Sequence, residues 1–263
     1  VTPGSAFSGT VRGVGDNVTE FQEGDRVLGH GINKYTPWPG AFADYSVAPT
    51  DRVAKLPSDV PFDVGAAIGH VGLTAWLGMI EYGDTRPGDT VLIHGGSGGV
   101  GHIAVQLAKI AGASRIIATA GSDERRAAVR RLGATDVLDY HDDDLKESIM
   151  DVGRPDGILD HRIADYLELD IEVANWKADI VGIMGHEAGF TNALEARRKN
   201  VAFHQVGATG HSNIGRRLTK LATLLSYDQL TVEIAATFDL ADADQAHRMV
   251  QEESFVGKVI VTP

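Results

Sequence analysis

The sequence predicts an α/β fold in which a doubly wound parallel sheet follows a smaller β-rich domain. Residues 1 to about 55 contain short β-like runs broken by Gly and Pro, namely SGTVRGVG, DRVLGHG, FADYSVA and DRVAKLP. Such runs are typical of an antiparallel or barrel-like domain. From Pro61 onward, apolar strands alternate with segments of helical periodicity. This second pattern predicts a parallel sheet covered by helices.

Six strands are expected in the parallel sheet. They read TVLIH, RIIAT, DVLDY, DGILD, ADIVGIM and VAFHQV. The later segment IGRRLTKLATLLSYDQL is expected to form a helix that packs on this sheet, because apolar residues share one face; these are Ile214, Leu218, Leu221 and Leu225. One more strand, a helix and a closing strand, GKVIVTP, are expected after it.

Composition excludes several function classes. The chain of 263 residues has 24 basic and 36 acidic side chains and a net charge of -12, which argues against a nucleic-acid or anionic-membrane partner. It contains no cysteine, so disulfides, thiolate zinc sites and a cysteine nucleophile are excluded. We find no apolar run near the ~20 residues of a membrane span and no signal-peptide pattern, and we expect a cytoplasmic protein. The acidity would also suit a salt-adapted host without requiring one.

A glycine-rich turn follows the first strand of the sheet and opens a helix, in the stretch HGGSGGVGHIAVQLAK. Gly96, Gly98 and Gly101 have the G-x-G-x-x-G spacing. The first glycine permits a tight turn, the second lets a pyrophosphate approach the main chain, and the third allows close packing of helix on strand. The helix N-terminus then faces the phosphates. The position between strand and helix predicts dinucleotide binding over a merely flexible loop.

The end of the second strand decides which dinucleotide is expected. An NAD enzyme usually carries Asp or Glu there, whereas an NADP enzyme needs hydroxyls and a cation for the 2′-phosphate. Here Ser122 and Arg125 stand near the expected place, and Asp123 falls in the first turn of the next helix. Arg126 has the stronger claim to be ordinary surface charge. The pattern favours NADPH.

These residues resemble a known family. The stretches PGSAFSGTVRGVGDNVTEFQEGDRVLG, GAFADYSVAP, GLTAW, HGGSGGVGHIAVQLAK, LGATDVLDY and GKVIVTP look like the zinc-independent, zeta-crystallin-like quinone oxidoreductases of the medium-chain dehydrogenase/reductases. The resemblance implies a GroES-like catalytic domain made from both chain ends, residues 1–75 and 227–263, around a Rossmann domain, residues 76–226. It places the active site in the cleft between the two domains.

The resemblance also implies particular cofactor contacts. The turn formed by Ser97, Gly98, Gly99 and Val100 would hold the pyrophosphate, and Ser122 with Arg125 would grip the 2′-phosphate. Tyr140 falls where a family tyrosine lies along the adenosine half. Met184 and Gly185 end a strand whose counterpart passes the nicotinamide half, and Lys258 belongs to the terminal GKV pattern. The cofactor-binding residues expected are thus Gly96, Ser97, Gly98, Gly99, Val100, Gly101, Ser122, Arg125, Tyr140, Met184, Gly185 and Lys258.

The chain departs from the family in two respects, and it also differs from the zinc-dependent sister branch. Relatives begin tens of residues earlier with segments beside the nicotinamide and quinone, so either these are missing from the sequence at hand or the protein is truncated. The DHR segment at 160–162 replaces a glycine-bearing segment and is expected in a solvated loop. Zinc-dependent relatives carry Gly-His-Glu where this chain has Gly4, Ser5 and Ala6. The histidines His30, His70 and His94 lack a paired ligand spacing, so no metal is expected.

Three functions remain open. The first is an NADPH:quinone oxidoreductase that transfers hydride without a metal. The second is an enone or enoyl-thioester reductase on the same scaffold, and the third is an NADPH-binding protein without turnover. No catalytic residue is assigned, although Tyr35 in the loop GINKYTPWPG could overhang the site. The strand VAFHQV is expected at the sheet edge, where two copies would pair as a homodimer.

Overall fold

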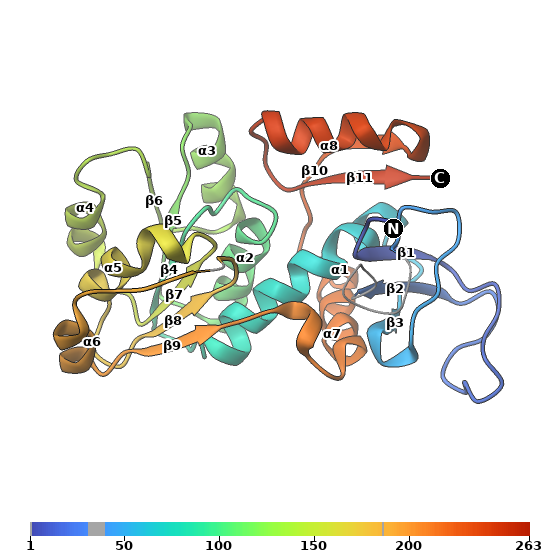
Figure 1. Ribbon diagram of the computed structural model, residues 1–263, viewed down its shortest axis with the longest axis horizontal. Coiled ribbons are helices and arrows are strands. Elements are labelled where there is room, and N and C mark those ends of the chain that lie inside the picture. Colours follow the sequence, from blue (N-terminus) through green and yellow to red (C-terminus); the bar gives the residue numbers. More distant parts are fainter. Residues whose placement is uncertain (1, 31–39, 186) are drawn as a thin grey trace. The chain divides into compact units, whose positions relative to one another are not determined.

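The computed structural model describes residues 2–30, 40–185 and 187–263, and it divides into two compact units. One unit contains residues 1–73 and 208–263, and the other contains residues 74–207 (Figure 1). The domain assignment 1–75, 76–226 and 227–263 stays a prediction. Tyr35 lies outside the described residues.

The unit 74–207 contains a six-stranded parallel sheet in the order β6-β5-β4-β7-β8-β9. All six strands expected in this sheet form, which confirms the doubly wound α/β fold. The strands are β4 (Thr90–Ile93), β5 (Arg115–Thr119), β6 (Asp136–Leu138), β7 (Gly157–Asp160), β8 (Asp179–Gly182) and β9 (Ala202–Gln205). Strand order reverses between β4 and β7, and in such sheets a ligand crevice opens at the carboxyl ends of the strands at this switch point.

Helices cover both faces of this sheet (Figure 1). On one face lie η2 (Leu77–Tyr82), α2 (Gly101–Ala111) and α3 (Asp123–Leu132), and on the other lie α4 (Leu145–Val152), α5 (Ile163–Val173) and α6 (Ala193–Lys199). Leu92 and Ile93 of β4 are completely buried, as expected for a central strand covered on both faces. Ile149 of α4 and Ile171 of α5 close the core on the second face.

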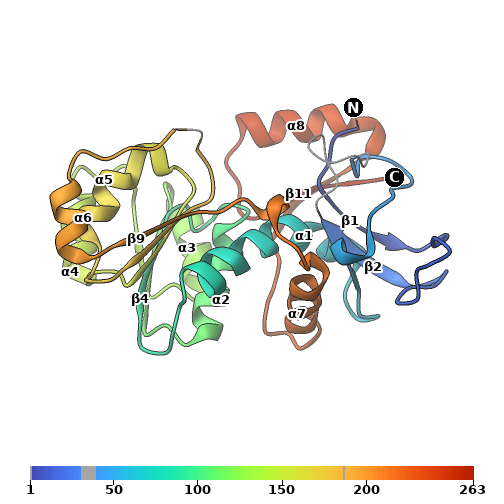
Figure 2. The same cartoon turned by 60° about the horizontal axis from the view of Figure 1, so that its bottom comes forward.

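The other unit is built from both ends of the chain. Three antiparallel strands, β1 (Ala6–Thr10), β2 (Arg26–His30) and β3 (Val53–Lys55), form one sheet, and the parallel pair β10 (Ile234–Asp239) and β11 (Lys258–Thr262) forms another. Helix α8 (Ala243–Glu252) packs on the parallel pair, and Figure 2 shows it running alongside β11. The unit also contains α7 (Ile214–Ser226), the 3-10 turns η1 (Thr50–Arg52), η3 (Ala208–Gly210) and η4 (Leu240–Asp242), and most of α1 (Phe62–Trp76).

The prediction that the helix now labelled α7 packs on the parallel sheet was wrong. The helix packs on β2, β3 and η1 rather than on the parallel sheet. Its main chain comes so close to β3 that a Cβ on Gly215 would lie 2.4 Å from the carbonyl oxygen of Val53. Apolar periodicity identified the buried face correctly, since Leu218 and Leu221 are fully buried. Periodicity says which face is covered, but it does not say which element covers it.

The segment FADYSVA is not a strand, contrary to expectation. Its first residues bend, and the side chains of Tyr45 and Val47 are 72% and 59% exposed. The main-chain N–H groups of Gly40, Ala41 and Phe42 donate to the carbonyls of Thr2, Gly4 and Pro3, but among the described residues no main-chain bond joins residues 43–48 to a neighbouring strand. Alternating polarity alone therefore does not make a strand where no neighbouring edge continues the ladder.

One helical stretch among the described residues, Phe62–Tyr82, is long and apolar enough to cross a membrane by composition. No apolar run of this length was expected from the sequence. In the structure, 67% of its most apolar window is buried within the protein. Leu73 and Leu77 are completely buried, so the stretch serves as a core helix.

Candidate functional site

The glycine-rich turn lies between β4 and α2, at the switch point of the parallel sheet. Gly95 has φ +64°, a left-handed conformation that suits glycine. Its N–H donates to Oγ1 of Thr119 at 2.9 Å, and the N–H of Gly96 donates to the carbonyl of Thr119 at 2.8 Å. Both bonds tie the turn to the end of β5. The turn is thus held by the sheet and is not a flexible loop.

The three fingerprint glycines meet different constraints. A Cβ on Gly101 would lie 2.1 Å from the carbonyl oxygen of Gly95, and one on Gly96 would lie 2.9 Å from Cβ of Ala118. These two positions exclude any side chain because the main chain packs so closely on its neighbours. A Cβ on Gly98 would meet only the Gly95 oxygen, at 3.3 Å. Gly98 therefore keeps the outer surface of the turn bare, where a ligand could approach the backbone.

The turn presents main-chain donors at the start of α2. Within the described part of the chain, the N–H groups of Ser97, Gly99 and Val100 have no protein acceptor. Val100 occupies the N-cap position without a side-chain cap. Unpaired N–H groups at a helix N-terminus attract anions, because their partial positive charge adds to that of the helix dipole. The residues present fit the pyrophosphate of a dinucleotide.

Ser122 and Arg125 come together at the start of α3. Ser122 is the N-cap, and its Oγ accepts the N–H of Arg125 at 3.3 Å and the Nε–H of the same arginine at 3.1 Å. Among the described residues, the terminal guanidinium nitrogens of Arg125 have no acceptor, and the side chain forms no ion pair. This pair leaves a hydroxyl and a guanidinium beside the end of β5.

Arg126 has a different role from its neighbour. Its guanidinium forms ion pairs with Asp123, at 2.6 Å, and with Asp139 after β6. A guanidinium shared between two carboxylates is committed to holding α3 against the end of β6. Arg125 is therefore the arginine that remains available to an anion.

Tyr140 lies beside the turn that follows β5. A Cβ on Gly121 would fall 2.4 Å from the Tyr140 hydroxyl oxygen, so the phenol rests directly on the main chain there. The ring of His141 packs against the tyrosine at 4.4 Å between centroids. Tyr140, Gly121 and Ser122 thus form one surface at the carboxyl ends of β5 and β6.

Two other predicted residues follow β8. Met184 is 64% exposed, and Gly185 has φ +117°, where a Cβ would lie 3.0 Å from Cγ2 of Ile163 in α5. The structure therefore puts both residues at the carboxyl edge of the parallel sheet, along with the turn. Their assignment to the nicotinamide half of a cofactor stays a prediction.

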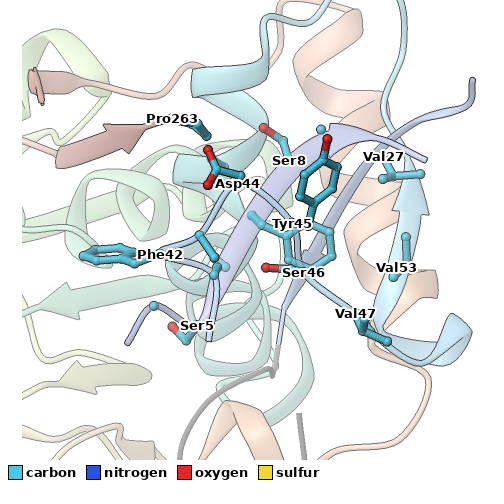
Figure 3. Close-up of a pocket in the computed structure, with 18 of the residues that line it drawn as sticks. Ser5, Ser8, Val27, Phe42, Asp44, Tyr45, Ser46, Val47, Val53 and Pro263 are labelled. Atoms are coloured by element: carbon cyan, nitrogen blue, oxygen red, sulfur yellow. The ribbon is translucent and has the colours of Figure 1, made fainter. Parts of the chain in front are cut away.

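Lys258 belongs to the other unit, where it lines a cavity of about 1270 Å³. Figure 3 shows Phe42, Asp44, Tyr45 and Ser46 in the same cavity wall. Burial lowers the pKa of Lys258 below its ordinary value. Its assignment to cofactor binding stays a prediction.

The DHR segment behaves differently from the expected solvated loop. Arg162 is exposed and pairs with Asp165, but the carboxyl of Asp160 is completely buried. The ring of His161 packs on the glycine turn, because a Cβ on Gly95 would lie 2.5 Å from its Cε1. Burial, followed by the charge of His94, lowers the pKa of His161, which favours the neutral imidazole.

A zinc site does not fit the side chains present. His30 and His70 approach each other at 3.3 Å between ring nitrogens, and Nδ1 of His30 also lies 3.0 Å from the carbonyl oxygen of Ser5. Across residues 2–30, 40–185 and 187–263, no group of three His, Cys, Asp or Glu side chains could hold a metal. Burial lowers the pKa of His30 to about 3 and that of His70 to about 4. We derive no step through a metal.

Two protein families match the chain. Residues 99–252 match the zinc-binding dehydrogenases, and residues 1–58 match the alcohol dehydrogenase GroES-like domain. The human quinone oxidoreductase is 38% identical over 141 residues, which cover 54% of this chain and 41% of that protein. A phenolphthiocerol/phthiocerol polyketide synthase component of Mycobacterium tuberculosis is 28% identical over 98% of this chain and 12% of its own length.

Solved structures with the same fold cover nearly the whole chain. An NAD-dependent alcohol dehydrogenase superposes with a TM-score of 0.88 at 26% identity, over 100% of this chain and 82% of its own. The quinone oxidoreductase from Coxiella burnetii has a TM-score of 0.85 at 30% identity, with 99% and 78% covered. A mycobacterial protein complexed with NADPH has a TM-score of 0.87 at 26% identity, with 99% and 82% covered.

The steric difference between the glycines predicts unequal effects of alanine. Gly101→Ala should lower the free energy of unfolding by about 1–3 kcal/mol, the usual loss when a close contact is overpacked. Gly98→Ala should cost less, since its Cβ would meet the Gly95 oxygen at 3.3 Å rather than at 2.1 Å. Urea unfolding followed by circular dichroism measures both. Equal losses in the two variants would contradict the close approach of α2 to the turn.

Proposed function

The chain belongs to the medium-chain dehydrogenase/reductase superfamily, and we propose that it transfers a hydride from NADPH to a quinone without a metal. Its quinone oxidoreductase relatives support its assignment as an NAD(P)-dependent oxidoreductase. The observation that carries the NADPH proposal is the Ser122 and Arg125 pair at the end of β5. The NADPH-bound mycobacterial structure supports it, whereas the NAD-dependent neighbour makes the cofactor a matter for direct test.

In this proposal each part of the site has one task. The N–H groups of Ser97, Gly99 and Val100 bind the pyrophosphate, and the guanidinium of Arg125 binds the 2′-phosphate. Tyr140 packs along the adenosine half. The cofactor, when bound, supplies the hydride that reduces the acceptor. One proton must accompany each hydride to convert the quinone to the hydroquinone, and the chain's own residues give no assignment for its donor.

The donor set favours an acceptor that is already electrophilic. Without a Lewis acid to polarise an alcohol oxygen, alcohol dehydrogenation loses its usual activation. A quinone accepts hydride without such help, so orientation and exclusion of water supply most of the catalysis. An activated alkene would react similarly. The similarity to a polyketide synthase component supports a second candidate, an enone or enoyl-thioester reductase.

Two copies are proposed to pair through β9, the edge strand of the parallel sheet. In the described sheet, β9 has a hydrogen-bonded neighbour on one side, β8. Phe203 of β9 is 40% exposed and stacks on Phe190 at 5.1 Å between centroids, and Leu194 of α6 is 49% exposed. An unpaired edge with apolar side chains favours association, since pairing satisfies the free main-chain groups. We also propose a cytoplasmic location.

Arg125→Ala should weaken NADPH binding by about tenfold to a hundredfold, the effect expected for losing one charge-assisted phosphate contact. Binding of NADH, which has no 2′-phosphate, should stay unchanged. Fluorescence titration gives both dissociation constants. Arg131→Ala is the matched control, because Arg131 is an exposed arginine on the same helix. Equal losses for NADPH and NADH would refute the assigned phosphate contact.

An acceptor panel separates the proposed reactions. The full-length protein should oxidise NADPH with simple quinones well above a heat-inactivated control, and more slowly with enones and enoyl thioesters. The decrease of NADPH absorbance is the measurement. Faster turnover with the alkenes would replace the quinone proposal with the second candidate. NADPH binding without turnover of any acceptor would indicate a binding protein.

The dimer predicts a mass change on a single substitution. Phe203→Lys should place a charge in the paired edge and convert the dimer to a monomer, as measured by light scattering after size exclusion. Tyr227→Lys is the control, because Tyr227 is 71% exposed and lies outside the parallel sheet. A monomeric unmodified protein, or a dimer that survives Phe203→Lys, would exclude pairing through β9.

A further inference from the structure

Three ionisable side chains are completely buried beneath the glycine turn. His94 follows β4, Asp160 ends β7, and Asp170 lies in α5; the side chains of His94 and Asp170 are 0% exposed, as is Asp160. Nε2 of His94 lies 2.9 Å from Oδ1 of Asp170. The sequence does not identify these three residues as a group, because they are far apart in the chain. The parallel sheet brings them together at its switch point.

This cluster holds two acids against one base. Burial opposes the charged imidazolium, but attraction to Asp170 and the hydrogen bond with it outweigh burial and raise the pKa of His94, which favours the cationic form. Burial and then the charge of Asp170 raise the pKa of Asp160 to about 6. One oxygen of each carboxylate, Oδ2 in both cases, lacks a hydrogen-bond partner in the described structure. The second acid is therefore uncompensated when it is ionised.

The cluster is joined directly to the proposed pyrophosphate turn. His94 immediately precedes Gly95, and its main-chain N–H donates to the carbonyl of Leu159 at 3.0 Å. Asp160 Oδ1 accepts the N–H of Arg162 at 2.6 Å, which fixes the start of α5. Between them, the ring of His161 packs on Gly95. A change in the charge of Asp160 therefore affects the turn in two ways: it can shift the residues that contact the turn, and it alters the electrostatic field there.

We propose that Asp160 is a positioning residue of the dinucleotide site and that it takes up a proton when a dinucleotide binds. This inference rests on the proposed function, since it assumes that the turn holds a pyrophosphate. With both carboxylates ionised, His94, Asp160 and Asp170 together carry at least one net negative charge. A pyrophosphate adds more negative charge nearby, and buried charges are poorly screened by solvent. Protonation of Asp160 removes the repulsion.

The other groups around the cluster do not produce the same effect. Tyr166 stacks on His94 at 4.5 Å, and burial raises the pKa of its phenol, so it stays neutral. Burial and then the charge of His94 lower the pKa of His161, which favours its neutral form; Asp160→Asn retains this histidine, so any proton that it exchanges cancels in the comparison of the two proteins. Arg162 and Asp165 form an exposed ion pair with no net charge. The comparison with Asp160→Asn therefore isolates the proton taken up by Asp160.

The sign of the pH dependence follows by linkage. Because the bound pyrophosphate favours the protonated form, the pKa of Asp160 is higher in the complex, and dinucleotide affinity should rise as pH falls from that higher pKa toward the pKa of Asp160 in the free protein. The 2′-phosphate titrates in the same range with the opposite effect. Arg125 favours the fully ionised form of the 2′-phosphate, so the 2′-phosphate would release protons when the cofactor binds. Net proton uptake therefore separates Asp160 from the 2′-phosphate.

Calorimetric titration with NADP⁺ tests the proposal, since the oxidised cofactor survives acid. Repeating the titration at pH 6.5 in two buffers of different ionisation enthalpy counts the protons exchanged. Unmodified protein should take up a substantial fraction of a proton beyond the exchange seen in Asp160→Asn. Its affinity should also improve by about tenfold relative to the variant between pH 7.5 and 5.5. At pH 7.5, Asp160→Asn should bind NADP⁺ more tightly than the unmodified protein does.

A matched control uses the second His–Asp pair of the same unit. His204 and Asp179 also lie 2.9 Å apart, but both are more than a quarter exposed and lie away from the turn. Asp179→Asn should keep the pH profile of the unmodified protein. If Asp160→Asn does not fold, the unmodified protein still decides when it is titrated with NAD⁺, which has no 2′-phosphate, because proton release or no proton exchange at pH 6.5 then overturns the proposal. Binding with identical profiles in both proteins overturns it too, whereas absence of NADP⁺ binding at every pH overturns the dinucleotide site itself.

Discussion

The close main-chain contact between the start of α2 and the turn after β4 is the constraint on which the site depends. At Gly101 the helix backbone meets the Gly95 carbonyl with no room for a Cβ, and at Gly96 the turn meets β5 almost as closely. Such contact is possible only with glycine at both positions. It brings the N–H groups at the helix start to the carboxyl edge of the sheet, where an anion can reach them.

Two adjacent arginines show how helix geometry divides binding from structure. Ser122 caps α3, so the next residues leave the cap in fixed directions around the helix. Arg126 is directed to Asp123 and Asp139 and locks the helix to β6, while Arg125 returns to Ser122. Arg126 holds α3 in place, and Arg125 on the same helix remains available to an anion. A single cation could not fill both roles, because an ion pair with Asp139 neutralises the charge that a phosphate needs.

The parallel sheet could be predicted from the sequence because its strands are short apolar runs separated by helical periods, and burial on both faces imposes that pattern. The turn could be predicted because its glycines answer local backbone constraints. Where prediction failed, the missing information was tertiary. Leu218 and Leu221 marked the buried face of α7 but not β3 as its partner, and the alternation in FADYSVA could not reveal that Tyr45 faces solvent. His94, Asp160 and Asp170 looked unrelated because only strand order makes them neighbours.

Burial distinguishes the cluster at the switch point from an ordinary ion pair. The pairs His94–Asp170 and His204–Asp179 have the same length, but only the first is removed from water. An exposed pair contributes little and costs little, whereas a buried pair loses hydration that its attraction only partly restores. A third buried charge, on Asp160, adds to that cost, and an apolar trio of similar volume would often be more stable. The charges at this position are therefore better explained by what they do to the turn above them than by the stability of the sheet.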